Sequence, residues 1–141
     1  MIPPTSRISL FSYFKGEAWR TQKLVRQLLK DCYHNAPNGV PGNEDTGTMS
    51  AWAIFSMMGF YPACPGDVNY VLTSPTFDKV TIDKKFYPKG ELVIESKHSN
   101  PEAIYIKDVF AGDKKLKGYT ISQEDLVNAG TLRYILEDTH K

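Results

Sequence analysis

The stretch Thr46-Gly-Thr-Met-Ser-Ala-Trp-Ala-Ile-Phe-Ser-Met-Met58 decides how this chain can fold. It is apolar almost all round after its first turn, so it predicts a helix over 46–58 that has no polar face for water. Gly59 is a natural C-cap for this helix, and Pro62 and Pro65 prevent it from continuing. A helix of this kind belongs inside a larger assembly.

The segment before this helix predicts an amphipathic helix from Gly16 to Tyr33. Its basic side chains fall opposite an apolar arc, which consists of Leu24, Val25, Leu28, Leu29 and Cys32. The following residues, His34 to Gly42, are rich in Pro, Gly and Asn, which predicts an irregular loop. An amphipathic outer helix, a loop and a buried inner helix are the elements that a two-layered helical barrel requires.

The second half of the chain predicts short strands, because β-branched and aromatic residues cluster in short runs. These runs are Tyr70–Thr73, Lys79–Asp83, Leu92–Ser96, Ala103–Phe110 and Thr131–Leu136. Ala111-Gly112-Asp113 is a hairpin turn signal, and Ser122 begins a short capped helix that Gly130 ends. The predicted fold class is therefore α+β, with a helical hairpin over 1–65 followed by a small antiparallel β segment over 66–141.

Bulk composition sets further limits on the function of the chain. The 141 residues are 41% hydrophobic and carry a formal net charge of +1, so one modest core is expected and binding to nucleic acid is disfavoured. No stretch is apolar for long enough to cross a bilayer, so no membrane partner is expected. Cys32 and Cys64 match neither a zinc pattern nor a disulfide framework.

The residues that could carry chemistry lie just before the buried helix, in Gly42-Asn43-Glu44-Asp45. Two carboxylates and an amide at such a place need partners, because an unpaired buried polar group costs about 1 to 3 kcal/mol. An Asp or Thr ahead of a helix is most often an N-cap, and the spacing of oxygen side chains does not match an EF-hand calcium loop. A ligand, a metal or a dense hydrogen-bond network could supply these partners.

Several separate motifs resemble glycoside hydrolase family 92, and they occur in the order found in that family. They are Gly-Glu-Ala-Trp-Arg-Thr-Gln-Lys-Leu-Val-Arg from Gly16, Gly-Asn-Glu-Asp from Gly42, Met-Ser-Ala-Trp from Met49, Gly-Phe-Tyr-Pro from Gly59, Thr-Ser-Pro from Thr73 and Asn-Pro-Glu-Ala-Ile-Tyr-Ile from Asn100. The resemblance extends from about Phe11 nearly to the C-terminus. It identifies the chain as similar to the C-terminal end of such an enzyme.

The resemblance implies a calcium-dependent exo-α-mannosidase that inverts the anomeric centre, built from an N-terminal β-sandwich and an (α/α)6 barrel. By motif position, Asp45 is the expected general base, while Asn43 and Glu44 are expected to contact substrate or to orient the loop. Glu44 is about as well explained as a structural acceptor. The family's general acid, most of its calcium ligands and the remainder of the barrel fall outside these 141 residues.

Other polar and aromatic residues have simpler interpretations. His34, His98 and His140 are expected at the surface, because each lies in a stretch of ordinary polarity. Trp52 is expected in the core because its neighbours are apolar, whereas Trp19 lies outside the main apolar arc of its helix and has no assigned role.

We expect the isolated chain to be inactive as an enzyme, since only half of the catalytic pair of carboxyl groups is present. Its partners in an intact enzyme would be α-mannoside glycans. The alternatives are a non-catalytic carbohydrate-binding or interaction module that uses the sheet, and a truncated product without activity of its own. Met1 to Leu10 do not resemble a signal peptide, so localisation remains open, although intact relatives are commonly periplasmic or secreted.

Overall fold

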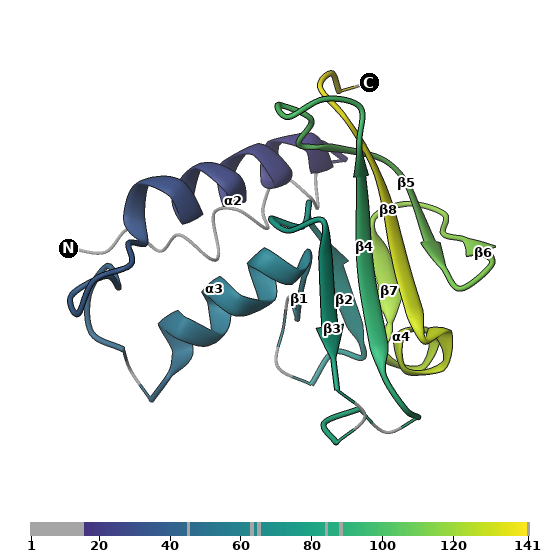
Figure 1. Ribbon diagram of the computed structural model, residues 1–141, viewed down its shortest axis with the longest axis horizontal. Helices are drawn as coiled ribbons and strands as arrows, with labels where there is room; N and C mark the ends of the chain where they lie inside the picture. The colour runs from purple at the N-terminus through teal and green to yellow at the C-terminus, as the bar shows by residue number, and fades with distance from the viewer. Residues whose placement is uncertain are drawn as a thin grey trace.

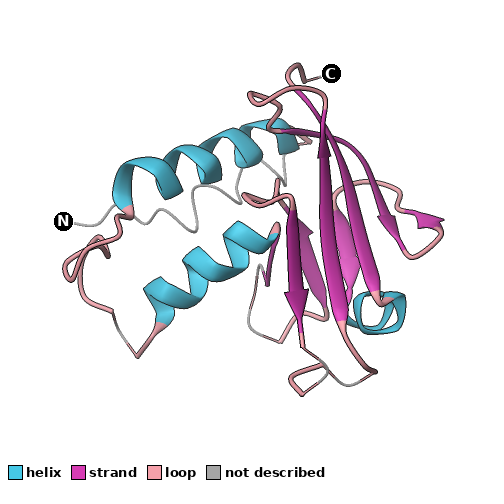
Figure 2. Ribbon diagram, in the orientation of Figure 1, coloured by secondary structure: helices cyan, strands magenta, loops and turns pink. Residues whose placement is uncertain are grey.

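The computed structural model describes residues 16–44, 46–62, 64, 66–83, 85–87 and 89–140. Two long helices lie side by side on one flank of the molecule, and the strands form the other flank (Figures 1 and 2). Of the described helices, the two long ones are α2 (Ala18–Cys32) and α3 (Thr48–Met58), and the short one is α4 (Gln123–Ala129). This arrangement confirms the predicted mixture of helices and strands.

Helix α2 is amphipathic, as the sequence predicts. The side chains that face inward recur every three or four residues and are Ala18, Thr21, Gln22, Val25 and Leu29. Two of these are polar, so the buried face extends nearer to the start of the helix than the apolar arc alone indicated. Burying a glutamine requires a hydrogen-bond partner, and Gln22 has one in the sheet.

Helix α3 ends at Gly59, which confirms the predicted cap. Gly59 has φ +96°, and its N–H donates to the carbonyls of Phe55 and Ser56 at 3.1 and 3.2 Å. Trp52 and Ala53 pack with residues of α2 in a small core between the helices. Trp52 is therefore a core residue, as expected. Ile54 points away from that core and is 58% exposed.

The strands form two sheets. The three-stranded sheet has the order β1–β2–β7 and is antiparallel, and its strands are β1 (Phe60–Pro62), β2 (Asn69–Leu72) and β7 (Thr120–Ser122). The five-stranded sheet has the order β3–β4–β8–β5–β6, and its strands are β3 (Lys79–Ile82), β4 (Leu92–His98), β8 (Thr131–Glu137), β5 (Tyr105–Ala111) and β6 (Lys114–Lys115). The main core lies between these sheets and α4.

The prediction of an antiparallel β segment is wrong for the centre of the larger sheet, because β4 and β8 run parallel, from Val93 opposite Thr131 to His98 opposite Leu136. Parallel neighbours require a long crossover connection, and here the chain passes through β5, β6, β7 and α4 before it returns. The alternation of side chains is the same in both strand directions, so the sequence pattern could not reveal this pairing.

Two local predictions in this half are confirmed. The hairpin between β5 and β6 turns at Gly112 and Asp113, with Ala111 opposite Lys114. Helix α4 begins at Ser122, whose Oγ accepts a hydrogen bond from Asp125 N at 3.0 Å, and it ends at Gly130 with φ +66°.

The helices and the sheets are directly connected. β1 follows α3 immediately and pairs with β2, on the far side of the expected boundary at residue 65. Tyr134 at the centre of β8 is fully buried and donates from its hydroxyl to Gly59 O at 2.8 Å. Within the described ranges, no helix is long and apolar enough to cross a membrane.

Candidate functional site

The loop between α2 and α3 is held by close backbone contacts. His34 N donates to Gly39 O, and Gly39 N donates to Ala36 O, both at 2.9 Å. A Cβ at position 39 would lie 1.8 Å from His34 O, so this turn requires glycine. The loop therefore reverses the chain within a few residues and leads it to the start of α3.

Tyr33 fixes the end of α2 against the start of α3. Its hydroxyl donates to Met49 O at 3.2 Å, and its ring stacks on Trp52 with centroids 5.7 Å apart. The pKa of Tyr33 is raised, first by burial and then by the charges of neighbouring groups that include Glu44. The sequence Gly42-Asn43-Glu44 thus reaches α3 beside a constrained tyrosine.

Glu44 caps helix α3. Its Oε1 accepts a hydrogen bond from Ser50 N at 2.9 Å, and its backbone carbonyl accepts from Thr48 N at 3.0 Å. A carboxylate at a helix N-terminus also interacts favourably with the helix dipole. The observed capping group is therefore the Glu44 carboxylate. This is one of the two roles that the sequence allowed for Glu44, the other being contact with substrate.

The two residues before α3 adopt unusual backbone conformations. Thr46 has φ +63° and Gly47 has φ +85°. Glycine adopts such angles freely, but a β-branched residue there is strained, at a cost of order 1 to 3 kcal/mol. Such strain tends to gather at ligand-binding and active sites, where the surrounding structure maintains it.

The three candidate site residues, Asn43, Glu44 and Asp45, differ in their exposure and in whether the structure describes them. Asn43 is exposed and Glu44 is half-buried. Asp45, the expected general base, lies outside the described residues. The structure therefore places Glu44, which directly precedes Asp45, at the N-terminal end of α3.

Calcium would need ligands beyond the side chains that the described residues bring together. Calcium takes six to eight oxygen ligands. In the part of the chain that the structure describes, no three His, Cys, Asp or Glu residues gather as a metal site. The Glu44 carboxylate is already engaged by Ser50 N.

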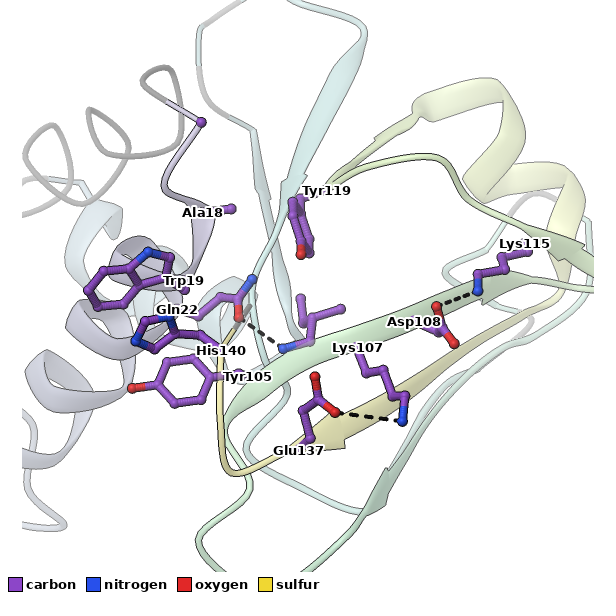
Figure 3. A pocket seen from close by; sticks show the side chains of 12 residues that line it. Ala18, Trp19, Gln22, Tyr105, Lys107, Asp108, Lys115, Tyr119, Glu137 and His140 are labelled. Atoms are coloured by element: carbon purple, nitrogen blue, oxygen red, sulfur yellow. Dashed lines mark hydrogen bonds and ion pairs between the residues drawn. The ribbon is translucent and has the colours of Figure 1, made fainter.

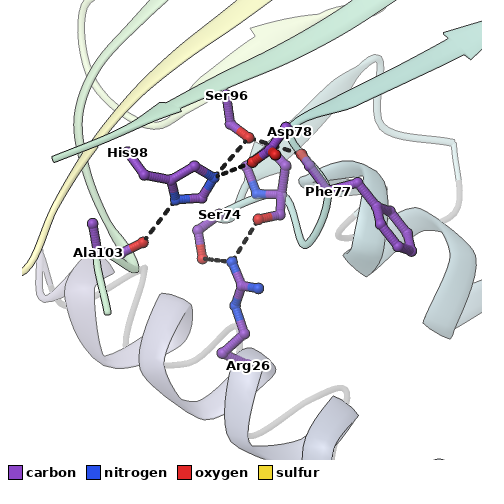
Figure 4. A network of polar contacts seen from close by, with 8 residues as sticks. Arg26, Ser74, Phe77, Asp78, Ser96, His98 and Ala103 are labelled. Carbon is purple, nitrogen blue, oxygen red and sulfur yellow. Dashed lines mark hydrogen bonds and ion pairs between the residues drawn. The ribbon is translucent and has the colours of Figure 1, made fainter. Parts of the chain in front are cut away.

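A second polar network, which the sequence analysis missed, connects α2 to the sheet (Figure 4). Arg26 Nη2 donates to Pro75 O at 2.5 Å and lies 3.4 Å from Ser74 Oγ. Burial lowers the pKa of this guanidinium. The sequence predicted a solvated Arg26 side chain, because this residue lies opposite the apolar arc of α2.

His98 lines the same hollow as Arg26 and is half-buried, which corrects the expectation of a simple surface position. Its Nδ1 lies 3.3 Å from Ala103 O, and its Nε2 lies 3.2 Å from both Ser96 Oγ and Asp78 Oδ1. The ring joins the end of β4 to the loops on either side (Figure 4). Ser96 Oγ donates onward to Phe77 O at 2.8 Å.

The chain belongs to glycosyl hydrolase family 92, since the model of the family's catalytic domain matches residues 3–138. A secreted glycosidase of uncharacterised function from Arthroderma benhamiae is 28% identical over 137 residues, which are 94% of this chain and 17% of that relative.

Solved structures of the same family are similar in fold. A GH92 α-mannosidase from Bacteroides thetaiotaomicron, solved in complex with mannoimidazole, matches with a TM-score of 0.86 and 25% identity over 98% of this chain and 18% of its own. An inverting GH92 mannosidase from strain VPI-5482 of that organism matches with a TM-score of 0.72 and 31% identity over 86% of this chain and 16% of its own. The chain thus spans less than a fifth of the length of these relatives.

Proposed function

We propose that this chain forms the C-terminal part of an exo-α-mannosidase that hydrolyses α-mannosides with inversion at the anomeric carbon. The observation that carries the proposal is the match over 98% of the chain to an α-mannosidase bound to mannoimidazole. The strained loop and the Glu44 cap at the start of α3 support it, because both hold this segment in one conformation, as a catalytic side chain requires.

Asp45 is the general base in this proposal. An inverting glycosidase uses two carboxyl groups roughly 6.5 to 9.5 Å apart, one that protonates the leaving oxygen and one that activates water on the opposite face of the sugar. A base must be ionised, and the N-terminus of a helix favours a carboxylate. The general acid comes from a part of the enzyme outside these 141 residues.

Asn43 and Glu44 support the base in different ways. Asn43 is exposed, so its amide can hydrogen-bond a sugar hydroxyl or the attacking water. Glu44 acts mainly as a positioning residue, because its bond to Ser50 N holds the loop on the first turn of α3. Loss of this bond displaces Asp45 rather than removing a reacting group.

The helices α2 and α3 are the last pair of an (α/α)6 barrel in this proposal, with the β-rich segment over 66–141 as its closing part. The surface of α3 supports this placement. Ile54 is 58% exposed and lines a hollow of about 420 Å³ that is bordered mainly by apolar side chains, including Leu29, Ala53 and Met57. The remainder of the barrel would cover this surface, and an N-terminal β-sandwich would complete the enzyme.

Calcium belongs to the proposal as a property of the family. We expect most of its ligands from the part of the enzyme outside these 141 residues, since no three His, Cys, Asp or Glu side chains gather as a metal site among the described residues.

A chimera tests the catalytic proposal. This chain would replace the corresponding C-terminal part of a GH92 α-mannosidase, and hydrolysis of an aryl α-mannoside would be measured with calcium present. We expect turnover by the chimera and a loss of at least about 100-fold in kcat for Asp45→Asn, the lower range for general base catalysis. Asp67→Asn, in an exposed loop, is the matched control.

The positioning role of Glu44 is separated from a direct role by Glu44→Gln. Glutamine retains an oxygen acceptor for Ser50 N, so the variant should keep most of the activity of the chimera, whereas Glu44→Ala should lose it.

Equal turnover by Asp45→Asn and the unaltered chimera would refute the assignment of the base. The isolated chain should show no turnover in any form.

A further inference from the structure

A cavity of about 330 Å³ lies far from the Asn43–Glu44 loop, at the opposite end of α2. Its walls come from the start of α2, from β5, from the end of β8 and from Tyr119 (Figure 3). Figure 1 shows the start of α2 beside β5 and the C-terminus, whereas the other end of α2 leads into the loop. A helix of 15 residues spans about 22 Å, so the two places are separate.

Two ion pairs line this cavity. Lys107 Nζ lies 3.6 Å from Glu137 Oε2, and Lys115 Nζ lies 2.5 Å from Asp108 Oδ1. The four formal charges cancel within the lining, so the cavity does not favour a strongly charged ligand. It offers ammonium donors and carboxylate acceptors side by side, which is the pattern that a hydroxyl group, at once a donor and an acceptor, can satisfy.

An irregularity in β5 brings these charges together. Neighbouring residues of a strand normally point to opposite faces, but Lys107 and Asp108 both line the cavity. The pairing of β5 with β8 shifts register between Ile106 and Asp108, which is a bulge. Bulges re-aim side chains and recur beside binding sites.

Aromatic rings form the other wall. Trp19 stacks on His140 with centroids 3.9 Å apart and an interplanar angle of 4°, and Tyr105 meets the same imidazole edge-on at 5.3 Å. The Arg20 guanidinium lies 5.1 Å from the Trp19 ring centroid. Figure 3 shows Tyr119 pointing into the space between this aromatic group and the two ion pairs.

Gln22 belongs to the cavity lining. Gln22 is buried, and its Oε1 accepts a hydrogen bond from Ile106 N at 2.9 Å, which holds the start of β5 against α2. The volume falls at the small end of the range of about 300 to 1,000 Å³ that is typical of ligand sites. A single sugar ring, neutral and rich in hydroxyl groups, matches this size and this balanced lining.

We propose that this cavity binds one neutral hexose unit and is a saccharide-binding site separate from the Asn43–Glu44 loop. Asp108 and Glu137 accept hydrogen bonds from sugar hydroxyls, Lys107 and Lys115 donate to them, and Tyr119 supplies an apolar face for the C–H side of the ring. The site requires no hydrolysis and is independent of the catalytic proposal.

Ligand-observed saturation-transfer NMR on the full chain tests this inference, because it detects weak binding even if the protein associates. The probes are methyl α-mannoside, methyl α-glucoside and methyl α-galactoside, with glucuronate as the charged counterpart. We expect saturable binding of at least one neutral glycoside. Glu137→Gln and Asp108→Asn should each weaken it by about five- to tenfold, because the amide oxygen still accepts but the charge-assisted hydrogen bond to the sugar becomes a neutral one of about half the strength.

The chain offers matched controls for both substitutions. Glu95→Gln and Asp125→Asn make the same chemical changes in the ion pairs with Lys79 and Lys114, and neither residue lines the cavity. Both controls should bind like the unaltered chain, and circular dichroism should show all four variants folded. Absence of binding by every neutral glycoside, equal weakening in the controls, or tighter binding of glucuronate would overturn the inference. None of these results would affect the chimera experiment.

Discussion

At the scale of single residues, Gly59 joins the helical and the β parts of the chain. It caps α3, its carbonyl accepts from Thr73 N and from the Tyr134 hydroxyl, both at 2.8 Å, and its φ is +96°. A Cβ there would lie 2.7 Å from Pro75 Cγ and 3.0 Å from Thr73 O. Both the backbone conformation and the close packing therefore require glycine.

We predict that Gly59→Ala lowers the free energy of unfolding by about 2 to 5 kcal/mol, the sum of left-handed strain and overpacking. Gly66→Ala is the matched control, because Gly66 has φ +84° but no atom within 4 Å of an added Cβ. It should cost only about 1 to 2 kcal/mol. Urea unfolding monitored by circular dichroism measures both values, and equal losses would contradict the steric argument.

Tyr134 gives the fold a dependence on alkaline pH. Burial raises the pKa of this phenol far above its ordinary value of 10.0, and burial also raises the pKa values of Tyr33 and Tyr87. The unfolded chain releases these protons as the pH passes about 10, while the folded chain retains them. The stabilisation from these groups is complete below pH 10 and is lost above it.

We predict that Tyr134→Phe reduces the alkaline slope of the free energy of unfolding by up to about 1.4 kcal/mol per pH unit. At neutral pH the variant should lose only about 1 kcal/mol, because Gly59 O keeps its bond from Thr73 N. Denaturant titrations between neutral pH and pH 11 measure both effects. An unchanged slope would show that the Tyr134 phenol does not control the alkaline transition.

At the scale of elements, Gln22 connects α2 to the sheet. Its side chain is 2% exposed, and its only described partner in the sheet is Ile106 N at the start of β5. β6 pairs only with Phe110 and Ala111 at the far end of β5. The N–H of Ile106 therefore has no strand partner on that edge and donates to Gln22 of α2 instead. The helix and the sheet are therefore joined by a polar contact within an apolar interface.

We predict that Gln22→Met lowers the free energy of unfolding by about 1 to 3 kcal/mol, the cost of leaving a buried N–H without an acceptor. Gln27→Met is the matched control on the exposed face of the same helix and should change stability by less than about 0.5 kcal/mol. Hydrogen exchange should show faster exchange of the Ile106 amide in the first variant alone. Equal stability of the two variants would count against this connection.

At the scale of the whole molecule, the surface around Ile54 decides how the isolated chain behaves. An exposed isoleucine on an apolar helix borders a hollow of about 420 Å³. Exposed apolar patches larger than a few hundred Å² mark surfaces that partners cover. In our proposal the partner is the rest of the barrel.

We predict that the isolated chain binds a hydrophobic dye and self-associates, and that Ile54→Glu reduces dye fluorescence by on the order of twofold. Val68→Glu is the control, since Val68 is 63% exposed elsewhere on the surface and does not line the hollow. Sedimentation velocity should show a smaller average species for Ile54→Glu alone. A monomeric chain without dye binding would contradict the proposal that the rest of the barrel covers the surface around Ile54.

The sequence alone was sufficient for features whose cause is local. The apolar run from Thr48 to Met58, the cap at Gly59, the serine cap of α4 and the Gly112 turn follow from periodicity and from the needs of individual backbone positions, and each is found in the structure. The order of motifs also led to the correct glycoside hydrolase family.

Tertiary structure decided what depends on contacts between distant residues. The parallel pairing of β4 with β8, the short strands β1 and β7, and the polar contacts of the half-buried Arg26 and His98 have no local signature. The cavity beside Trp19 forms only because a bulge in β5, the start of α2 and the C-terminal residues meet in space. Local patterns reflect one residue's neighbours along the chain, whereas strand direction, buried charge and cavities depend on which segments the fold brings together.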